Sequence, residues 1–316
     1  MKSDIYGQND RQVIESQDET HLSKNAMITI VGRPNVGKST LTNVLTGDKV
    51  AIVTPKPQTT RNRICGVFNH DETQMILLDT PGFHKPRTRL GDYMVGIVKE
   101  SIADVDAVAL MVEPIDNIGM QEDLLIKHIG ETGVPAILVI NKIDTIKIDL
   151  TLPIIERYSQ RHNFDAIIPI SAKKGNGISE LLEVFEKFAK EGPQLFPDGM
   201  TTDQPEKQII AEIIREKLLI CLELEIPHGT AVEITKFSER ETDEIIDIDA
   251  TIYCEKKSHK GMIIGKNGTM LKKVGQLARE DIERFMGAKV FLQTWVKVKE
   301  NWRDSQTMMK NFGYVK

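Results

Sequence analysis

The sequence of 316 residues predicts an α/β domain, whose mixed but mostly parallel sheet has helices on both faces, followed by a smaller α+β domain. As far as Lys190, short runs rich in Val, Ile and Leu alternate with amphipathic stretches. Strands of a parallel sheet that is buried on both faces have this composition, and the connecting helices supply the amphipathic stretches. Beyond residue 205 helical and strand-like stretches follow in another order, which indicates a separate domain.

The predicted elements fall into two sets. The strands of the first domain are Met27–Val31, Met75–Leu78, Ala107–Val112, Ala136–Ile140 and Ile167–Ile170. Its helices are Ser39–Leu45, Leu90–Ala103, Gln121–Ile129, Leu152–His162 and Ile178–Lys190. The second domain is predicted to contain Lys207–Leu224 (helix), Ala231–Phe237 and Ile245–Tyr253 (strands), Met270–Phe285 (helix), Lys289–Val298 (strand) and a closing helix. Parallel sheets bind ligands at the carboxyl ends of their strands, so polar motifs directly after the first-domain strands are candidate site residues.

The predicted boundaries follow from composition. Residues 26–190 form the first domain and residues 206–316 the second. Residues 191–205 contain three prolines and two glycines, which is typical of a linker. Residues 1–25 are polar and lack the apolar core of a signal peptide, so we expect a flexible extension on a cytoplasmic protein. No apolar run reaches the roughly 18 residues needed to cross a bilayer.

A glycine-rich run with a terminal lysine and serine follows the first predicted strand and precedes a helix. This context and spacing predict a P-loop, in which backbone N–H groups point inward at phosphate oxygens. Lys38 is expected to reach the β- and γ-phosphates, and the Ser39 hydroxyl to bind Mg²⁺. The predicted phosphate-binding residues are Gly32, Arg33, Pro34, Asn35, Val36, Gly37, Lys38, Ser39 and Thr40.

Two further segments are predicted to complete the phosphate site. Asp79 ends a buried strand and is expected to hold Mg²⁺, and Gly82 is placed to offer a backbone N–H to the γ-phosphate. Residues 54–61 are rich in proline and threonine and form the predicted first switch loop. Within it Thr60, in preference to Thr59, is expected to bind Mg²⁺ and the γ-phosphate. The predicted metal ligands are therefore Ser39, Thr60 and Asp79.

The predicted base site follows the strand Ala136–Ile140. The Asp144 carboxylate can accept two hydrogen bonds from guanine, which adenine does not offer in that pattern, so this residue predicts GTP. Asn141 is expected to hold neighbouring loops, and the stem of Lys142 to lie along the ring. After the next strand the sequence reads Ser171-Ala172-Lys173, where the Ala172 N–H is expected to meet the guanine carbonyl oxygen.

The five segments in this order resemble the GTPase superfamily related to translation factors, and Asn35 with residues 57–61 resembles its Era-like branch. Ras-like members carry a water-positioning glutamine after the glycine that corresponds to Gly82, whereas this sequence has Phe83, and members of the Era-like branch are similar in having a hydrophobic residue there. The resemblance implies that K⁺ held by Asn35 can assist hydrolysis in place of an arginine finger. The predicted catalytic residues are Lys38, Thr60, Gly82 and Asn35. Structural or solvent-facing roles are expected for Arg33, Arg61 and His84.

Charged residues of the second domain are separated into an acidic stretch and a basic stretch. The net charge of −5 argues against nucleic acid, but residues 239–255 hold seven acids and one base, while residues 256–279 hold seven bases and no acid. A GxxG sequence lies in the basic stretch, where it can face the phosphates of single-stranded RNA, and the acidic stretch should confine binding to the lysine face. The predicted RNA-binding residues are Lys257, Lys260, Ile264, Gly265, Lys266, Asn267, Gly268 and Lys272. No DNA is expected.

With strands before and after it, the GxxG segment resembles a type II KH domain, and the two domains together resemble GTPases of the Era family. This resemblance implies GTP and GDP as ligands, Mg²⁺, the 3′ region of small-subunit rRNA as partner, and a role in assembly of the small ribosomal subunit. It also implies peripheral association with the inner face of the cell membrane, although nothing in the sequence predicts an anchor. Two alternatives stay open: a GTPase of the superfamily that acts on tRNA or another ribosomal target, and an RNA-binding scaffold with a structurally bound nucleotide.

Overall fold

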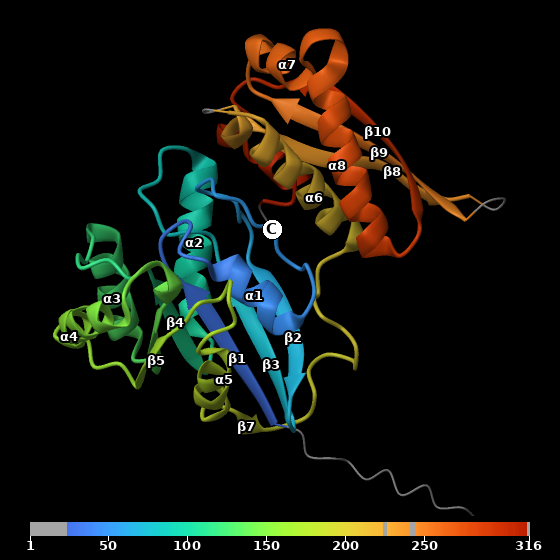
Figure 1. Ribbon diagram of the computed structural model, residues 1–316. Helices are drawn as coiled ribbons and strands as arrows, with labels where there is room; N and C mark the ends of the chain where they lie inside the picture. Colours follow the sequence, from blue (N-terminus) through green and yellow to red (C-terminus); the bar gives the residue numbers. More distant parts are fainter. Residues whose placement is uncertain (1–23, 224–225, 241–243, 315–316) are drawn as a thin grey trace, which may run out of the picture.

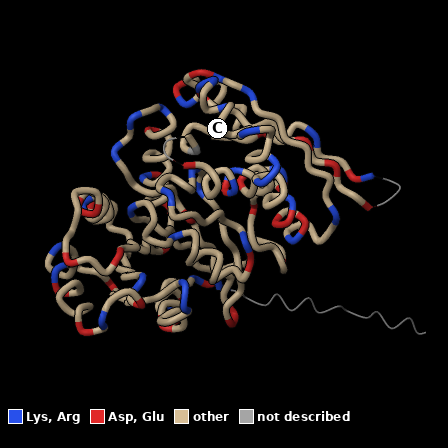
Figure 2. The backbone as a smooth tube through the Cα atoms, turned by 45° about the horizontal axis from the view of Figure 1, so that its top comes forward, with Lys and Arg blue, Asp and Glu red and all other residues tan. Residues whose placement is uncertain are grey.

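The computed structural model describes residues 24–223, 226–240 and 244–314, which form two domains (Figure 1). The predicted fold class is confirmed: a mixed, mostly parallel sheet with helices on both faces, and then an α+β domain. Within the described ranges, no helix is both long and apolar enough to cross a membrane. Figure 2 shows acidic and basic positions interspersed along both domains.

The sheet of the first domain has the order β2-β3-β1-β4-β5-β6. Its strands are β1 (Lys24–Val31), β2 (Ile64–His70), β3 (Thr73–Asp79), β4 (Ala107–Val112), β5 (Ala136–Ile140) and β6 (Ala166–Pro169), with the short β7 (Lys190–Glu191) beside β1. Neighbouring strands are parallel except β2 with β3 and β7 with β1. The carboxyl ends of β1, β3, β4, β5 and β6 therefore share one edge, where the predicted motifs begin.

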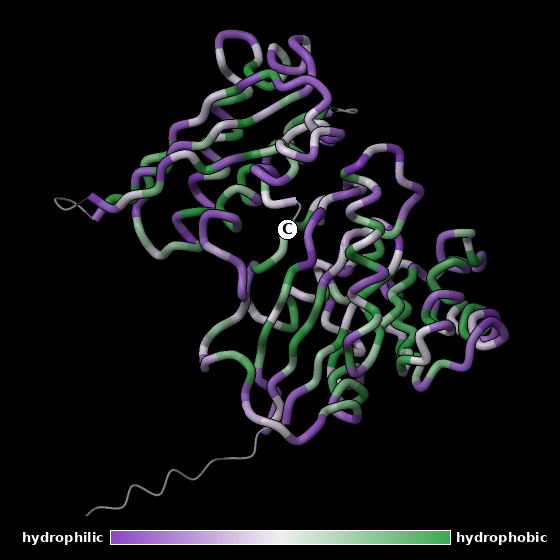
Figure 3. The backbone as a smooth tube through the Cα atoms, turned by 180° about the vertical axis from the view of Figure 1, so that it is seen from behind, coloured by the Kyte–Doolittle hydropathy of each residue, from purple (hydrophilic) through white to green (hydrophobic). Residues whose placement is uncertain are grey.

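Helices cover both faces of this sheet, and Figure 3 shows the hydrophobic strands running between them. The helices are α1 (Lys38–Thr46), α2 (Arg89–Ala103), α3 (Met120–Thr132), α4 (Thr151–Ser159) and α5 (Ile178–Glu186). On one face Leu41 of α1 and Phe185 of α5 pack into a buried cluster. On the other face the cluster contains Val98 of α2, Leu125 of α3 and Tyr158 of α4. Burial of these apolar stripes is what stabilises the helices against the sheet.

The structure differs from the predicted elements at β1 and β2. Strand β1 begins at Lys24, two residues before the predicted boundary, because its first residues pair with β3 and β7. The remainder of the predicted extension, residues 1–23, lies outside the described residues. Strand β2 was not predicted, because polar residues shorten its apolar pattern. Its Gly66 lies so close to α1 that a Cβ there would be 2.9 Å from the Thr42 and Thr46 methyl groups.

The predicted linker also makes defined contacts. The Gln74 side chain of β3 accepts hydrogen bonds from the backbone N–H groups of Leu195 (2.8 Å) and Phe196 (2.9 Å) and donates one to the Phe196 carbonyl (2.8 Å). These bonds fix the chain along the sheet before it enters the second domain. The predicted domain boundaries themselves stay a prediction.

The second domain packs helices on one face of a three-stranded sheet of order β10-β9-β8 (Figure 1). Its elements are α6 (Glu206–Cys221), β8 (Ala231–Glu239), β9 (Ile245–Cys254), α7 (Lys257–Ile264), α8 (Thr269–Met286), β10 (Lys289–Val298) and α9 (Gln306–Asn311). Strand β9 is parallel to β10 and antiparallel to β8. A buried cluster from α6, α8 and the three strands forms the core.

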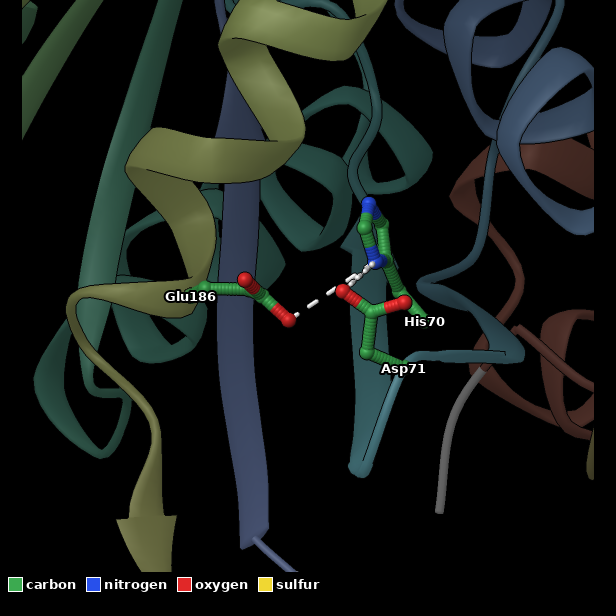
Figure 4. Close-up of side chains that lie close together, drawn as sticks. All are labelled: His70, Asp71 and Glu186. Atoms are coloured by element: carbon green, nitrogen blue, oxygen red, sulfur yellow. Dashed lines mark ion pairs between the residues drawn. The ribbon is translucent and has the colours of Figure 1, made fainter.

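A histidine and two acids meet at the opposite edge of the first sheet (Figure 4). The His70 Nδ1 atom lies 3.5 Å from an Asp71 carboxylate oxygen and 3.7 Å from one of Glu186. Because β2 runs antiparallel to β3, its end lies at the amino ends of the parallel strands, away from the predicted site. The Asp71 side chain is exposed, so this group contributes little to stability.

Candidate nucleotide site and RNA interface

The P-loop wraps around a buried lysine. The Lys38 ammonium donates hydrogen bonds to the carbonyls of Gly32 (3.2 Å) and Arg33 (3.0 Å), and the residue is only 6% exposed. Burial lowers the pKa of Lys38 to about 8, an effect that the nearby Asp79 carboxylate partly offsets. Gly37 has a φ of 107° at the start of α1, and a Cβ there would stand 2.2 Å from the Asn141 Nδ2 atom. The loop therefore requires glycine at this position.

Three oxygen-bearing side chains gather beside the P-loop. The Ser39 hydroxyl donates to an Asp79 oxygen at 2.6 Å and lies 2.9 Å from the Thr60 hydroxyl. The other Asp79 oxygen, Oδ1, is buried and makes no hydrogen bond. Burial raises the pKa of Asp79 to about 6, against the opposing effects of Lys38 and of the Ser39 hydrogen bond. A carboxylate and two hydroxyls, with one buried oxygen unpaired, fit the oxygen ligands that Mg²⁺ prefers.

The structure distinguishes the two threonines of the predicted switch loop. The Thr59 hydroxyl is 2.7 Å from the Thr54 hydroxyl and donates to the Lys56 carbonyl at 2.7 Å, so it is occupied within its own loop. Thr60 is the threonine that faces Ser39. This placement agrees with the preference for Thr60.

Gly82 and Asn35 link the P-loop to the neighbouring segments. A Cβ on Gly82 would lie 2.7 Å from Pro34, so the two backbones touch, and the Phe83 N–H donates to the Gly32 carbonyl at 3.0 Å. The Phe83 ring is buried among α2 and α3 and offers no group to an attacking water. Asn35 has a φ of 66°, and its Nδ2 donates to the Pro55 carbonyl at 2.7 Å. The side-chain oxygen of Asn35 is not used in that bond.

A cavity of about 430 Å³ lies between the P-loop and the segment from Ile52 to Thr60. Its lining includes all four residues that were predicted to be catalytic, namely Asn35, Lys38, Thr60 and Gly82. Thr40 and the stem of Lys142 also line it. The P-loop, the predicted switch loop and Gly82 thus surround one space, whereas Asp79, Asp144 and the segment 171–173 do not line it.

Two predicted phosphate-site residues turn their side chains away. Val36 is buried in the core on the α1 face. The Arg33 guanidinium forms an ion pair with Glu122 of α3 at 2.9 Å and approaches Glu113 at 3.9 Å. Val36 and Arg33 therefore offer only their backbone groups to the phosphate site. The Arg33 side chain has a structural role, as expected, because it pairs with Glu122.

Asn141 joins three loops at the predicted base site. Its Nδ2 donates to the Val36 carbonyl at 2.7 Å, and its Oδ1 accepts from the Ala172 N–H at 2.9 Å. The Ala172 N–H was expected to face the guanine carbonyl; the structure instead pairs it with Asn141, because that buried amide oxygen needs a donor. The Ser171 hydroxyl donates to Asp144 at 2.6 Å, which leaves the other carboxylate oxygen for the base. Lys173 is exposed in the turn that follows.

Lys142 connects the base loop to the P-loop. Its φ of 64° lets its ammonium group donate to the Asn35 carbonyl at 2.7 Å, and the same group contacts the Glu113 carboxylate. Glu113 was not singled out in the sequence. It directly follows β4, and polar residues at strand ends were the signal that could have found it.

The GxxG segment forms a tight turn between α7 and α8. Gly265, Asn267 and Gly268 have φ values of 74°, 51° and 76°, and a Cβ on Gly265 would lie 2.7 Å from the Met270 Cβ. Ile264 is partly buried and packs against the core. The lysines around the turn are exposed; they are Lys257, Lys260, Lys266 and Lys272.

The acidic end of the β8–β9 strand pair, which lies near the C-terminal end of α8 and not beside the GxxG turn, is partly neutralised. Asp247 of β9 forms ion pairs with Arg240 (2.7 Å) and Lys236 (3.1 Å). These pairs and the Lys236 and Arg240 hydrogen bonds lower the pKa of the Asp247 carboxyl. The predicted repulsion of phosphate by the acidic stretch is therefore weaker than its sequence suggests. Residues 241–243 of that stretch lie outside the described residues.

The P-loop, the oxygen cluster around Ser39 and the Asp144 base site define a P-loop GTPase, and the GxxG turn on a three-stranded sheet defines a KH domain. Residues 27–142 match the family described as 50S ribosome-binding GTPase, and residues 225–303 match the KH domain family. The chain belongs to the GTPase Era family and is a GTP-hydrolysing enzyme.

Relatives along nearly the whole chain support this assignment. GTPase Era of Ruminiclostridium cellulolyticum is 53% identical over 92% of this chain and 97% of that protein. GTPase Era of Clostridioides difficile is 50% identical over 92% of this chain and 98% of that protein.

Two solved structures match both domains together. A crystal structure of a point variant of Aquifex aeolicus Era bound to GDP·AlF4⁻ has a TM-score of 0.89 and 38% identity, over 93% of this chain and 100% of that one. A structure of Era with MgGDPNP and nucleotides 1506–1542 of 16S ribosomal RNA has a TM-score of 0.90 and 38% identity, with the same coverage.

Proposed function

We propose that this GTPase binds single-stranded RNA of the 3′ region of small-subunit rRNA and assists assembly of the small ribosomal subunit. The observation that carries the proposal is the lysine-ringed GxxG turn in the same chain as a GTP site. The relative solved with nucleotides 1506–1542 of 16S rRNA matches this chain across both domains, which supports this RNA over tRNA. Peripheral membrane association stays a prediction of the family resemblance.

In this proposal the first domain binds GTP with Mg²⁺. Ser39, Thr60 and Asp79 hold the metal, which neutralises charge on the β- and γ-phosphates. Lys38 contacts the same phosphates, and the P-loop N–H groups surround them. The Gly82 backbone N–H contacts the γ-phosphate. Asp144 selects guanine, and Asn141 keeps the P-loop and the Ser171 loop in register through its two 2.7–2.9 Å hydrogen bonds.

Hydrolysis then requires that a water attack the γ-phosphorus, giving GDP and phosphate. No glutamine follows Gly82, and the Phe83 ring is buried, so positioning of the water falls to backbone groups near Thr60 and Gly82. We propose that the side-chain oxygen of Asn35, which is not used in its bond to Pro55, would hold K⁺, and that this ion would supply positive charge near the phosphates. Equal turnover with Na⁺ and K⁺ at matched ionic strength would refute this role.

In the second domain the N–H groups of the GxxG turn and the lysines around it contact RNA phosphates, while bases enter the adjoining groove. Ile264 supports the groove from the core side.

Crosslinking and sequencing of RNA bound to the whole chain, with GTP or with GDP present, tests the proposed function. We expect fragments of the 3′ region of small-subunit rRNA, recovered more strongly with GTP. Recovery of tRNA or of large-subunit rRNA instead would refute the proposed target while leaving the GTPase assignment intact. A Gly265→Asp variant, which has a carboxylate at the RNA turn, serves as the background control.

A further inference from the structure

The segment between α1 and β2, residues 47–63, contains the predicted switch loop and lies against the KH domain (Figure 1). The Val53 N–H donates to the Glu216 carboxylate of α6 at 3.0 Å. Lys56 contacts the Leu222 carbonyl at the end of α6, and Arg215 of α6 contacts the Thr59 carbonyl. Helix α6 and its C-terminal end thus contact this segment at three residues, Val53, Lys56 and Thr59.

Arg61 makes the most extensive of these contacts. The residue is 3% exposed, and its guanidinium donates to the carbonyls of Thr230 (2.7 Å) and His228 (2.9 Å) and to the Tyr314 hydroxyl (3.3 Å). Its central carbon lies 5.6 Å from the ring centroids of both Trp302 and Tyr314, within the range of a cation–π contact. We call these four KH-domain residues, His228, Thr230, Trp302 and Tyr314, the Arg61 cage.

The cage is itself rigidly held. Trp302 is fully buried, and its ring N–H donates to the Gly229 carbonyl at 2.9 Å. The same cluster includes Leu90 and Met94 of α2. The cage therefore joins the segment before β8 to the C-terminal segment, and α2 packs against the same cluster.

The acceptors that Arg61 contacts in the cage are two carbonyls and a phenol, all of them neutral. Burial of its guanidinium lowers the pKa of Arg61, which shows that the charge is costly to desolvate. Arg215 differs, because the Glu212 carboxylate pairs with it on the same helix. Because a buried guanidinium has lost its hydration, loss of one of these acceptors would leave part of it without a hydrogen-bond partner.

The residue that precedes Arg61 is Thr60, whose hydroxyl lies 2.9 Å from Ser39. Thr60 is thus fixed on both sides by the KH domain, through the Arg215 contact with Thr59 and through the Arg61 cage. We propose that Arg61 is a positioning residue, through which the KH domain holds Thr60 in the nucleotide site and so sets the rate of GTP hydrolysis. This inference rests on the role of Thr60 under the proposed function.

The test compares variants on both sides of the cage in the full chain. Arg61→Ala removes every cage contact, Arg61→Lys keeps the charge, and Tyr314→Phe removes one hydroxyl from the KH side alone. Asn62→Ala is the matched control, because Asn62 also bridges the domains, donating to the Gly313 carbonyl at 3.1 Å, without contacting the cage. The readouts are kcat and KM for GTP, the affinities for GDPNP and GDP, and Tm.

We expect Arg61→Ala to lower kcat about tenfold and to weaken GDPNP binding several-fold, while GDP binding stays unchanged, because GDP lacks the γ-phosphate that Thr60 contacts. Arg61→Lys should restore part of kcat, Tyr314→Phe should lower kcat about two- to threefold, and Asn62→Ala should leave it unchanged. A purely structural role would lower Tm but leave kcat and the preference for GDPNP over GDP at their original values.

Two outcomes separate failure of this inference from failure of the proposed function. If Thr60→Ala lowers kcat but Arg61→Ala and Tyr314→Phe do not, the positioning role of Arg61 is overturned and the nucleotide site stands. If Thr60→Ala itself leaves kcat and GDPNP affinity unchanged, the assignment of Thr60 is wrong and the inference falls with it.

Discussion

The P-loop and the GxxG turn both contain glycine and asparagine with positive φ, but the two loops differ in how far they enclose their lysines. Asn35 and Gly37 in the first loop, and Asn267 and Gly268 in the second, all have positive φ and precede a helix. The first loop surrounds a lysine that is 6% exposed, whereas the lysines of the second are open to solvent. Enclosure suits one small ligand with defined geometry, and an open turn suits a polymer that must enter from the side.

The P-loop and the GxxG turn also differ in the space that is available for a side chain at their glycines. A Cβ on Gly37 would collide with Asn141, while one on Gly268 would meet no atom within 4 Å. In the open turn, however, Gly265 is packed against Met270, with a Cβ there only 2.7 Å away, so the contrast in space is between Gly37 and Gly268. The predictions below test this contrast.

Gly37→Ala should have the largest effect. Its Cβ would stand 2.2 Å from Asn141 Nδ2 at a φ of 107°, so we expect GTP affinity to fall at least about 100-fold. Gly268→Ala, the matched change in the open turn, should weaken RNA binding no more than about 30-fold, since it adds only the backbone cost of about 1–2 kcal/mol. Calorimetry with GDPNP and fluorescence anisotropy with labelled RNA measure the two. Normal GTP binding by Gly37→Ala would contradict the contrast.

Gly265→Asp should weaken RNA binding about 10- to 100-fold and leave GTP hydrolysis within about twofold of the original. The new carboxylate would repel RNA phosphate, and its Cβ would press on Met270, 2.7 Å away. Gly265→Ala is the control that adds the contact without the charge. If both variants lose RNA binding equally, packing and not charge governs the open turn.

The pH dependence of the two sites should differ because of Asp79. Its pKa is raised by burial to about 6, so the carboxylate gains a proton as the pH falls through about 6. Because Mg²⁺ binds the ionised form, Mg²⁺-dependent GTP binding should weaken up to about tenfold per pH unit below that value. RNA binding should change less, because the GxxG turn and its lysines do not contact Asp79. Flat Mg²⁺-dependent binding down to pH 5 would contradict the raised pKa of Asp79.

The smallest expected effect among these predictions is a change in the salt dependence of RNA binding. Replacing Lys266 by alanine should reduce the slope of log affinity against log salt by about 0.7, since one phosphate contact with a single strand is lost. Lys127→Ala, an exposed lysine on α3, should leave the slope unchanged. An unaltered slope for Lys266→Ala would place that lysine outside the RNA path.

The sequence predicted those parts of the nucleotide site whose function depends on residue type and spacing within a short segment. The residues from Gly32 to Ser39 and the Asn141 loop carry their function in residue type and spacing, and the structure gathers them at one edge of the sheet. Strand β2 escaped prediction because its pairing with β3, and not its own pattern, makes it a strand. The Arg61 cage escaped it as well, because its hydrogen-bonding partners lie 167 to 253 positions away along the chain.

The most direct test of coupling between the two loops is the affinity of the whole chain for a labelled fragment of the 3′ region of small-subunit rRNA, measured with GDPNP and with GDP. The contacts of residues 47–63 with α6 and the Arg61 cage predict that the two nucleotide forms differ, with RNA bound at least about fivefold more tightly in the GDPNP form. Equal affinities in the two forms would contradict coupling and leave the two loops as independent phosphate sites.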